Sequence, residues 1–352
     1  MKKIVMCGYY GMCDFRGDIV GHLGKVTKEY IDLLGEKYEI NLMVSPCLYK
    51  KFIGYGNIKA ESLDYDIVTD EPFTVRKRIL DKYKILKNID KCIRKSSSEI
   101  LFFYQVDFFF FLYLYLFYRK KNKRIYALVY HQNFTGGRLE KILNHIYRKA
   151  LNKLEGVIYT QEKQKIAHHK TLYLPDYIYD AEYYEKYNIS PKEQKVVCLG
   201  TMNRYKQLEE LVEVFKGIDI PLEVCGRFDD KERVQRLLKK KSHNVVIHDC
   251  VLSTEEYYRK LGRAKYSILP YDMKQYISRT SGVLLESVYV GSTPIAPRWL
   301  LEQNGMAGYG YENMEELQEF DWKFILEEEE KRTVLQKNDK RTAGKKLQDF
   351  LC

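Results

Sequence analysis

The chain is 45% hydrophobic and 30% charged, a composition that excludes a disordered polypeptide. Its length of 352 residues exceeds the size at which one hydrophobic core keeps growing, so we expect two folded domains. Residues 1–175 carry 31 Lys and Arg against 18 Asp and Glu, a net charge of +13, whereas the rest of the chain carries −2. The basic half is suited to an anionic membrane surface or to nucleic acid, while any single basic cluster is equally consistent with a solvated face.

The first half of the chain alternates short apolar runs with helical stretches. Lys3–Cys7 predicts a strand that leads into a glycine-rich turn containing Gly17, and Val26–Leu34 predicts a helix before a second strand at Glu39–Val44. Such alternation is typical of a largely parallel sheet that binds ligands at the carboxyl ends of its strands. Three further strands are predicted, with helices between them: Ile100–Tyr104, Arg124–Tyr130 and Gly156–Tyr159.

The segment from Ile100 to Tyr118 is almost wholly apolar and about as long as a membrane span. Gln105 and Asp107 interrupt it, and a charge near the bilayer centre costs at least ~2.5 kcal/mol. We therefore expect a buried strand followed by a helix whose N-cap is Asp107, with a transmembrane helix as the alternative.

The eight cysteines form no Cys-x-x-Cys pair, and several of them lie in apolar runs. The N-terminus becomes glycine-rich too early for a signal peptide, so we expect a cytoplasmic protein. We accordingly expect buried free thiols in a reducing compartment, rather than a disulfide framework or a zinc site.

The alternation of strands and helices restarts after Pro175. The whole pattern predicts the α/β fold class, with Rossmann-like domains at residues 1–175 and 176–330 and a C-terminal helix at 331–352. The strands predicted in the second domain are Lys195–Leu199, Leu222–Cys225, Asn244–Ile247, Tyr266–Leu269 and Thr293–Ala296, and the helices are Leu208–Phe215, Lys231–Lys239, Glu255–Leu261 and Val283–Val290.

Two loops of the second domain place glycine beside basic residues at the end of a strand. Gly200 follows the first strand directly, and Arg204 and Lys206 come before the next helix, where they could bind phosphates near its N-terminus. Gly226 ends the following strand in the same way. Each loop alone is equally consistent with solvated basic side chains.

A hydroxyl- and glycine-rich turn precedes the helix predicted at Val283–Val290. The turn, Arg279-Thr280-Ser281-Gly282, could bind a diphosphate through its charge and the N–H groups of the first helical turn. Glu286, one turn further in, could accept hydrogen bonds from a ribose. The alternatives are ordinary N-capping by Thr280 or Ser281 and a surface helix position for Glu286.

The order and spacing of Gly200…Lys206, Gly226, Glu286 and Gly291-Ser292-Thr293-Pro294-Ile295 resemble the C-terminal domain of GT-B glycosyltransferases of group 1, the GT4-like family. The resemblance covers roughly residues 170–300 and implies a GT-B architecture, in which two Rossmann-like domains face a cleft. It implies a glycosyltransferase that uses no cofactor or metal, takes its sugar from a nucleotide-sugar donor such as a UDP- or GDP-sugar, and usually retains configuration.

The resemblance also assigns roles to individual residues. Arg204, Lys206, Arg279 and the N–H groups at Thr280–Gly282 would stabilise the diphosphate leaving group in place of a metal ion. His131, which follows a strand and is equally consistent with a packed core residue, would face the transferred sugar together with the loop at Gly17. The catalytic set is His131, Arg204 and Lys206, and the donor-binding set is Gly17, Gly200, Arg204, Lys206, Gly226, Arg279, Thr280, Ser281, Gly282 and Glu286.

Two positions depart from the family's pattern. Thr201 stands where the family has a phosphate-binding arginine, a role that Arg204 could take. The family's paired glutamates lie eight positions apart, and the residue eight before Glu286 is Ser278. The missing carboxylate leaves the identity of the sugar, and retention against inversion, open.

The basic first half predicts a protein peripheral on the inner face of the plasma membrane that acts on a lipid-linked or other glycan acceptor, as in bacterial capsule, exopolysaccharide or cell-wall polymer assembly. The expected membrane contact is the basic cluster Arg119–Arg124, which follows an aromatic run. We expect no nucleic-acid partner.

Three alternative functions stay open. The first is a single-Rossmann glycosyltransferase, because Asp64-Tyr65-Asp66 has the form of the metal-binding DxD motif of those enzymes, but no glycine-rich donor fold surrounds it. The opening from Gly8 to Asp18 resembles polysaccharide pyruvyltransferases, a related GT-B architecture. The third is a non-enzymatic nucleic-acid-binding protein that uses the basic half, although the chain lacks RRM, KH and zinc-finger patterns.

Overall fold

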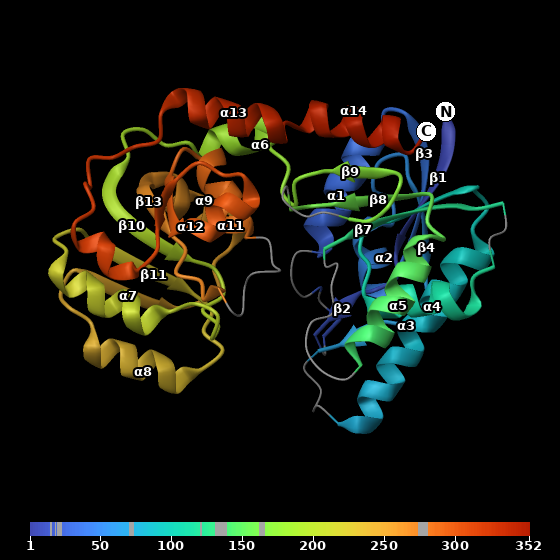
Figure 1. Ribbon diagram of the computed structural model, residues 1–352, viewed down its shortest axis with the longest axis horizontal. Helices are drawn as coiled ribbons and strands as arrows, with labels where there is room; N and C mark the ends of the chain where they lie inside the picture. The colour runs from blue at the N-terminus through green and yellow to red at the C-terminus, as the bar shows by residue number, and fades with distance from the viewer. Residues whose placement is uncertain are drawn as a thin grey trace. The chain divides into compact units, whose positions relative to one another are not determined.

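The computed structural model describes residues 1–14, 16–17, 19, 23–69, 74–119, 122–130, 139–161, 166–273 and 281–352. The chain divides into two compact units. Unit 1 contains Met1–Thr160, Lys165–Leu174 and Ala343–Cys352, while unit 2 contains Gln161–Gln164 and Pro175–Thr342. Each unit is built around its own parallel sheet (Figure 1).

The sheet of unit 1 has seven strands, and every neighbouring pair is parallel. Their order is β4-β3-β1-β6-β7-β8-β9, so the chain order runs in opposite directions on the two sides of β1. The carboxyl end of β1 is therefore a topological switch point, the position at which open α/β sheets bind ligands. The strands are β1 (Lys2–Gly8), β3 (Tyr38–Val44), β4 (Lys59–Ser62), β6 (Ile100–Phe103), β7 (Arg124–Val129), β8 (Gly156–Tyr159) and β9 (Thr171–Tyr173).

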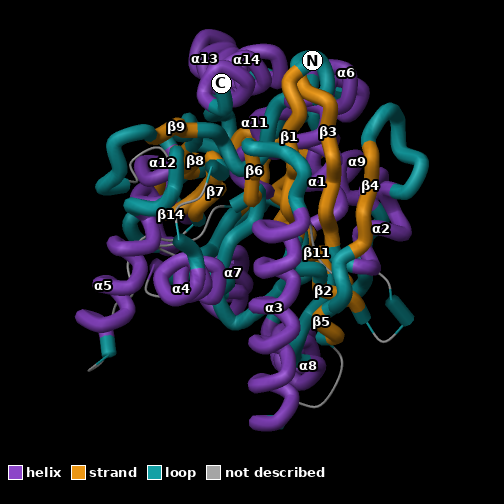
Figure 2. The backbone as a smooth tube through the Cα atoms, turned by 90° about the vertical axis from the view of Figure 1, so that its right-hand side faces the viewer, coloured by secondary structure: helices purple, strands orange, loops and turns teal. Residues whose placement is uncertain are grey.

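Two further short strands of unit 1, β2 (Met12–Cys13) and β5 (Ile67–Val68), pair in parallel beside the main sheet. The backbone tube in Figure 2 shows the helices that accompany the sheet. They are α1 (Leu23–Leu34), α2 (Pro46–Phe52), α3 (Val75–Lys95), α4 (Phe108–Phe117), α5 (Glu140–Leu151) and, at the C-terminus, α14 (Lys340–Phe350).

The apolar segment from Ile100 to Tyr118 folds as predicted into the buried strand β6 and the helix α4. The side chain of Asp107 caps α4 by accepting a hydrogen bond from the backbone N–H of Phe110 at 3.2 Å. Within the described part of the chain, no helix combines the length and the apolar character needed to cross a membrane.

The sheet of unit 2 has six strands in the order β12-β11-β10-β13-β14-β15, again all parallel. Here the chain order changes direction at β10, which lies between β11 and β13, so the carboxyl end of β10 is the switch point of this sheet. The strands are β10 (Glu193–Leu199), β11 (Leu222–Gly226), β12 (Val245–Asp249), β13 (Ala264–Ile268), β14 (Thr293–Pro297) and β15 (Tyr309–Tyr311).

Both faces of this sheet are covered. Successive side chains of a strand point to opposite faces, and so Val196 and Cys198 of β10 enter one apolar cluster while Val197 and Leu199 enter the other. The helical elements of unit 2 are α6 (Ala181–Tyr184), η1 (Glu185–Tyr187), α7 (Leu208–Val214), η2 (Phe215–Gly217), α8 (Lys231–Lys240), α9 (Thr254–Arg263), α11 (Gly282–Tyr289), α12 (Arg298–Asn304), η3 (Met314–Gln318) and α13 (Glu328–Asn338).

The C-terminal segment forms two helices, α13 and α14, where one was expected. Its last residues belong to unit 1, because Tyr38 donates a hydrogen bond to the carbonyl of Gln348 at 3.2 Å and the ring of Phe350 packs against Tyr126. The chain thus returns at its end to the unit in which it begins.

Candidate functional site

The carboxyl ends of β10 and β11 meet in a close backbone contact. A Cβ atom placed on Gly226 would lie 1.7 Å from the carbonyl oxygen of Gly200, which no side chain could tolerate. Gly200 itself has φ +97°, in the region that favours glycine. These two glycines, both predicted as ligand contacts, are therefore also required to bring the two strand ends together at the switch point.

Lys206 places a buried positive charge at the end of β10. Its side chain is only 4% exposed, and its ammonium group donates to the carbonyl oxygen of Leu199 at 2.7 Å. The Nζ atom lies 5.7 Å from the centre of the Tyr271 ring. An ammonium group has three N–H donors. The carbonyl of Leu199 and, at 3.8 Å, the thioether sulfur of Met202 accept two of them, which leaves one for an anion.

The first turn of α11 lies close to the Lys206 ammonium. A Cβ atom on Gly200 would be 3.9 Å from Nζ of Lys206 and also 3.9 Å from a methyl carbon of Val283 in α11. The Gly200 turn thus lies next to a cation and to the first turn of a helix, and both of these stabilise negative charge.

Ser281 is the N-cap of α11, as the alternative interpretation predicted. Its side chain accepts a hydrogen bond from the N–H of Leu284, at 3.4 Å. Gly282 follows it because a Cβ atom there would lie 2.4 Å from the ring of Tyr177. The ring of Tyr177 therefore packs directly against the first residue of the helix.

Glu286 is buried, at 5% exposure, and so it does not occupy a surface helix position. Its carboxylate accepts hydrogen bonds from the hydroxyl groups of Tyr257, at 2.8 Å, and Tyr258, both on α9. Burial, followed by the Glu286 charge, raises the pKa of both tyrosines well above the usual range, so they stay protonated donors. The two tyrosines fix the orientation of this carboxylate within the unit.

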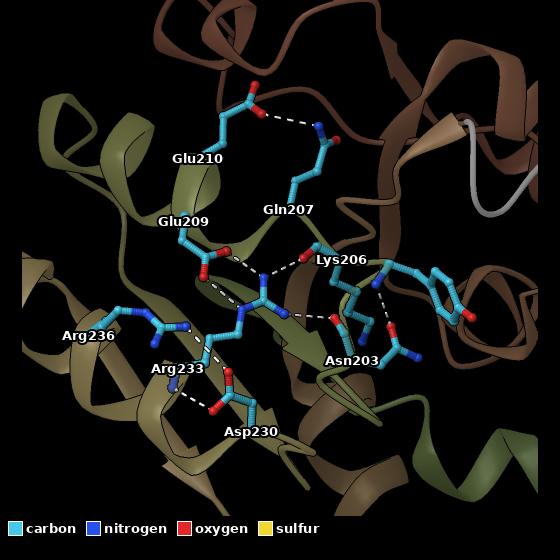
Figure 3. Close-up of polar contacts among 9 residues, drawn as sticks. Asn203, Lys206, Gln207, Glu209, Glu210, Asp230, Arg233 and Arg236 are labelled. Atoms are coloured by element: carbon cyan, nitrogen blue, oxygen red, sulfur yellow. Dashed lines mark hydrogen bonds and ion pairs between the residues drawn. The ribbon is translucent and has the colours of Figure 1, made fainter.

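Arg233 of α8 holds the loop that carries Lys206 (Figure 3). Its guanidinium donates to the backbone carbonyls of Asn203, at 2.8 Å, and Lys206, at 2.7 Å. The same group forms a two-pronged ion pair with Glu209, with one nitrogen–oxygen distance of 2.8 Å. Sequence reasoning did not find Arg233, since its contacts lie 24 to 30 positions away along the chain.

The structure describes two further predicted residues. Arg204 is exposed, with its guanidinium 5.4 Å from the centre of the Tyr205 ring. Gly17 lies in unit 1 and has φ +86°. Three predicted residues fall outside the described part of the chain: His131, Arg279 and Thr280.

The two carboxylates of Asp64-Tyr65-Asp66 have separate partners. Asp64 forms an ion pair with Lys91, and Asp66 accepts hydrogen bonds at 3.1 Å from the backbone N–H of Cys47. Because the two carboxylates bind different partners, the structure does not favour a shared metal site at this motif.

No family model and no curated protein matches the sequence. Solved structures match the whole chain. AviGT4, a glycosyltransferase involved in avilamycin A biosynthesis, is 10% identical, with a TM-score of 0.63 and coverage of 100% of this chain and 97% of that one. Anabaena Alr3699/HepE in complex with UDP and glucose is 10% identical, with a TM-score of 0.62 and coverage of 100% and 99%. The trehalose-6-phosphate synthase OtsA is 10% identical, with a TM-score of 0.66 and coverage of 100% and 99%.

At 10% sequence identity, this structural similarity establishes the fold alone. The prediction of an α/β protein with GT-B architecture is therefore confirmed. Membership of the GT4-like family stays a prediction.

Proposed function

We propose that this protein is a glycosyltransferase that moves a sugar from a UDP- or GDP-sugar to a lipid-linked or other glycan acceptor in bacterial surface-glycan synthesis. The observation that carries the proposal is the position of Lys206: a buried cation beside Gly200 and the first turn of α11, at the switch point of unit 2. Solved proteins with the same fold support it, since they include glycosyltransferases and one was solved with UDP and glucose.

In the proposed reaction, unit 2 binds the nucleotide part of the donor. Lys206 and the N–H groups at the start of α11 stabilise the charge that develops on the diphosphate as the glycosidic bond to it breaks. Glu286, oriented by its two tyrosines, binds the ribose hydroxyls. We assign Arg204, Arg279 and Thr280 to the same diphosphate, and His131 and Gly17 to the transferred sugar.

The first test is nucleotide binding without metal. In excess EDTA, saturating UDP or GDP should raise the melting temperature by several degrees, because a ligand at 100 times its Kd stabilises the folded state by about 2.7 kcal/mol. Thermal denaturation against a panel of nucleosides and nucleoside diphosphates measures this. Binding that needs manganese and is abolished by EDTA would contradict the proposed charge arrangement.

Part of the basic cluster Arg119–Arg124, from which the sequence predicts a membrane contact, makes hydrogen bonds within unit 1. Lys123 donates to the carbonyls of Ser96, at 2.8 Å, and Ser98, at 2.9 Å, and burial lowers its pKa. Arg124 donates to the carbonyl of Cys352 at 2.8 Å. Lys120 and Lys121 lie outside the described residues. Lys123 and Arg124 thus hold unit 1 together, and substituting them would disturb the fold, whereas Arg119 is exposed.

Helix α3 is the better candidate for the membrane contact. Its first turns project from the rest of unit 1 (Figures 1 and 2) and expose the side chains of Ile79, Leu80 and Tyr83, at 64%, 49% and 50%. The exposed basic residues Arg76, Arg78 and Lys82 accompany this apolar stripe. An exposed helix with apolar and basic residues side by side is typical of segments that lie in the interface of an anionic membrane.

Replacing Ile79, Leu80 and Tyr83 together by serine should lower binding to anionic vesicles about tenfold or more, since three apolar side chains would lose their burial in the bilayer. Nucleotide-induced stabilisation should not change, because the nucleotide binds in unit 2. Vesicle sedimentation measures the first effect. The matched control replaces Val246, Val251 and Ile325, exposed apolar residues of unit 2, by serine; equal losses in the two variants would contradict a membrane role for α3.

A further inference from the structure

Two thiols and a carboxylate converge in unit 1. Cys13 ends β2, Cys47 lies in the first turn of α2, and Asp66 immediately precedes β5. The two sulfur atoms and a carboxylate oxygen all lie within 4.8 Å of one another. Cys13 and Cys47 are each only 3% exposed, and Asp66 is half-buried.

Backbone contacts hold the three side chains in this arrangement. Cys13 pairs with Val68 in the β2–β5 ladder, which fixes it beside the strand that Asp66 precedes. The backbone N–H of Cys47 lies 3.1 Å from both carboxylate oxygens of Asp66. A Cβ atom on Gly11 would lie 1.7 Å from Oγ of Ser45, so the segments that carry Cys13 and Cys47 are in close contact. The three ligands are therefore positioned before any ion arrives.

The donor set is suited to a soft divalent cation. Thiolate sulfur and a carboxylate oxygen are ligands that zinc takes in tetrahedral sites. Burial raises the pKa of Cys13, and raises that of Cys47 to about 12, so a binding cation displaces a proton from each thiol. The positive charge of Lys50 acts on Cys13 and offsets part of the negative charge of the ligands.

We propose that Cys13, Cys47 and Asp66 bind one zinc-like cation, with water in the fourth position. The ion would join the glycine-rich segment after β1 to α2 and to the start of β5, and so stabilise the loop that carries Gly17. All three ligands lie in unit 1, whereas the nucleotide site is proposed in unit 2. The sequence did not predict it, because its ligands are spread from residue 13 to residue 66 without a metal-binding spacing.

The test uses the full chain, reduced, freed of metal with EDTA and then titrated with Zn²⁺ or Co²⁺. We expect uptake of about one ion per chain and, with Co²⁺, absorption bands of thiolate-to-metal charge transfer and of tetrahedral coordination. Cys13→Ser, Cys47→Ser and Asp66→Asn should each weaken the affinity by about tenfold or more. Asp66→Asn keeps an oxygen that can accept from the N–H of Cys47, so it tests the ligand with little change to the fold.

The control is Cys225→Ser, which removes a thiol that lies 3.5 Å from that of Cys250 in unit 2. This variant should bind the ion as the wild type does and show the same rise in melting temperature with Zn²⁺. The proposal is overturned if Cys225→Ser loses the ion, if the three unit 1 variants keep wild-type affinity, or if bound Co²⁺ shows no thiolate band.

Discussion

Replacing Lys206 by methionine is expected to lower the turnover number of sugar transfer about 10²–10³-fold, equivalent to roughly 3–4 kcal/mol of transition-state stabilisation. Methionine fills a similar space without the charge, and Lys206 is the buried cation beside the start of α11. The loss should fall mainly on kcat, because charge develops on the leaving diphosphate as the sugar departs. Steady-state kinetics with a UDP- or GDP-sugar and a short soluble acceptor measure it.

The matched control is Lys216→Met, which removes a lysine of the same unit whose side chain is 42% exposed and forms an ion pair with Glu213 at 2.8 Å. Its turnover should stay near that of the wild type. A Lys206→Met variant that folds, as shown by its melting temperature, and keeps full turnover would remove Lys206 from the mechanism.

Replacing Arg233 by methionine is expected to destabilise unit 2 by about 2–3 kcal/mol. The change leaves two backbone carbonyls, those of Asn203 and Lys206, without the donor that holds their loop, and it breaks the ion pair with Glu209. The loss is smaller than for a fully buried ion pair because the Glu209 side chain is 44% exposed. Denaturant unfolding followed by the fluorescence of unit 2 measures it.

Acidification should reduce the difference in free energy of unfolding between the wild type and Arg233→Met. The Arg233 guanidinium lowers the pKa of Glu209, so the ion pair stabilises the folded state above the usual pKa of a glutamate and loses that contribution as the pH falls through the lowered value. The control is Arg236→Met, one turn along α8, whose side chain is 55% exposed; it should cost less than about 0.5 kcal/mol. Equal destabilisation by the two variants would contradict the role of Arg233 in holding the loop that carries Lys206.

The central strands of both sheets could be predicted from sequence because they are apolar runs, some of which, such as β10 and β11, lead into glycine. β10, β11 and β13 each lie within a few residues of their predicted ranges. The strand β4, in contrast, consists of Lys-Ala-Glu-Ser at the edge of its sheet and carries no apolar pattern. Edge strands bury one side only, so backbone pairing rather than side-chain hydrophobicity determines them.

The candidate site likewise contains some residues that a local sequence pattern predicts and others that it does not. The sequence predicts Gly200 and Lys206 as site candidates because they follow a strand and precede a helix within a few residues, which is a local signal. Arg233 and the tyrosines that hold Glu286 could not be found, because they contact the site only after the helices pack on the sheet; Tyr257 and Glu286 are 29 positions apart. Long-range side-chain partners have no signature in a single sequence.

The most direct test of the nucleotide site is calorimetric titration of UDP and of uridine, or of GDP and guanosine, into the wild type, Lys206→Met and Glu286→Gln. If Lys206 binds phosphate, its variant should lose about 10–100-fold in affinity for the diphosphate and bind the nucleoside as the wild type does. If Glu286 binds the ribose, its variant should bind both ligands more weakly. Wild-type affinity of both variants for the diphosphate would contradict a nucleotide site at the end of β10.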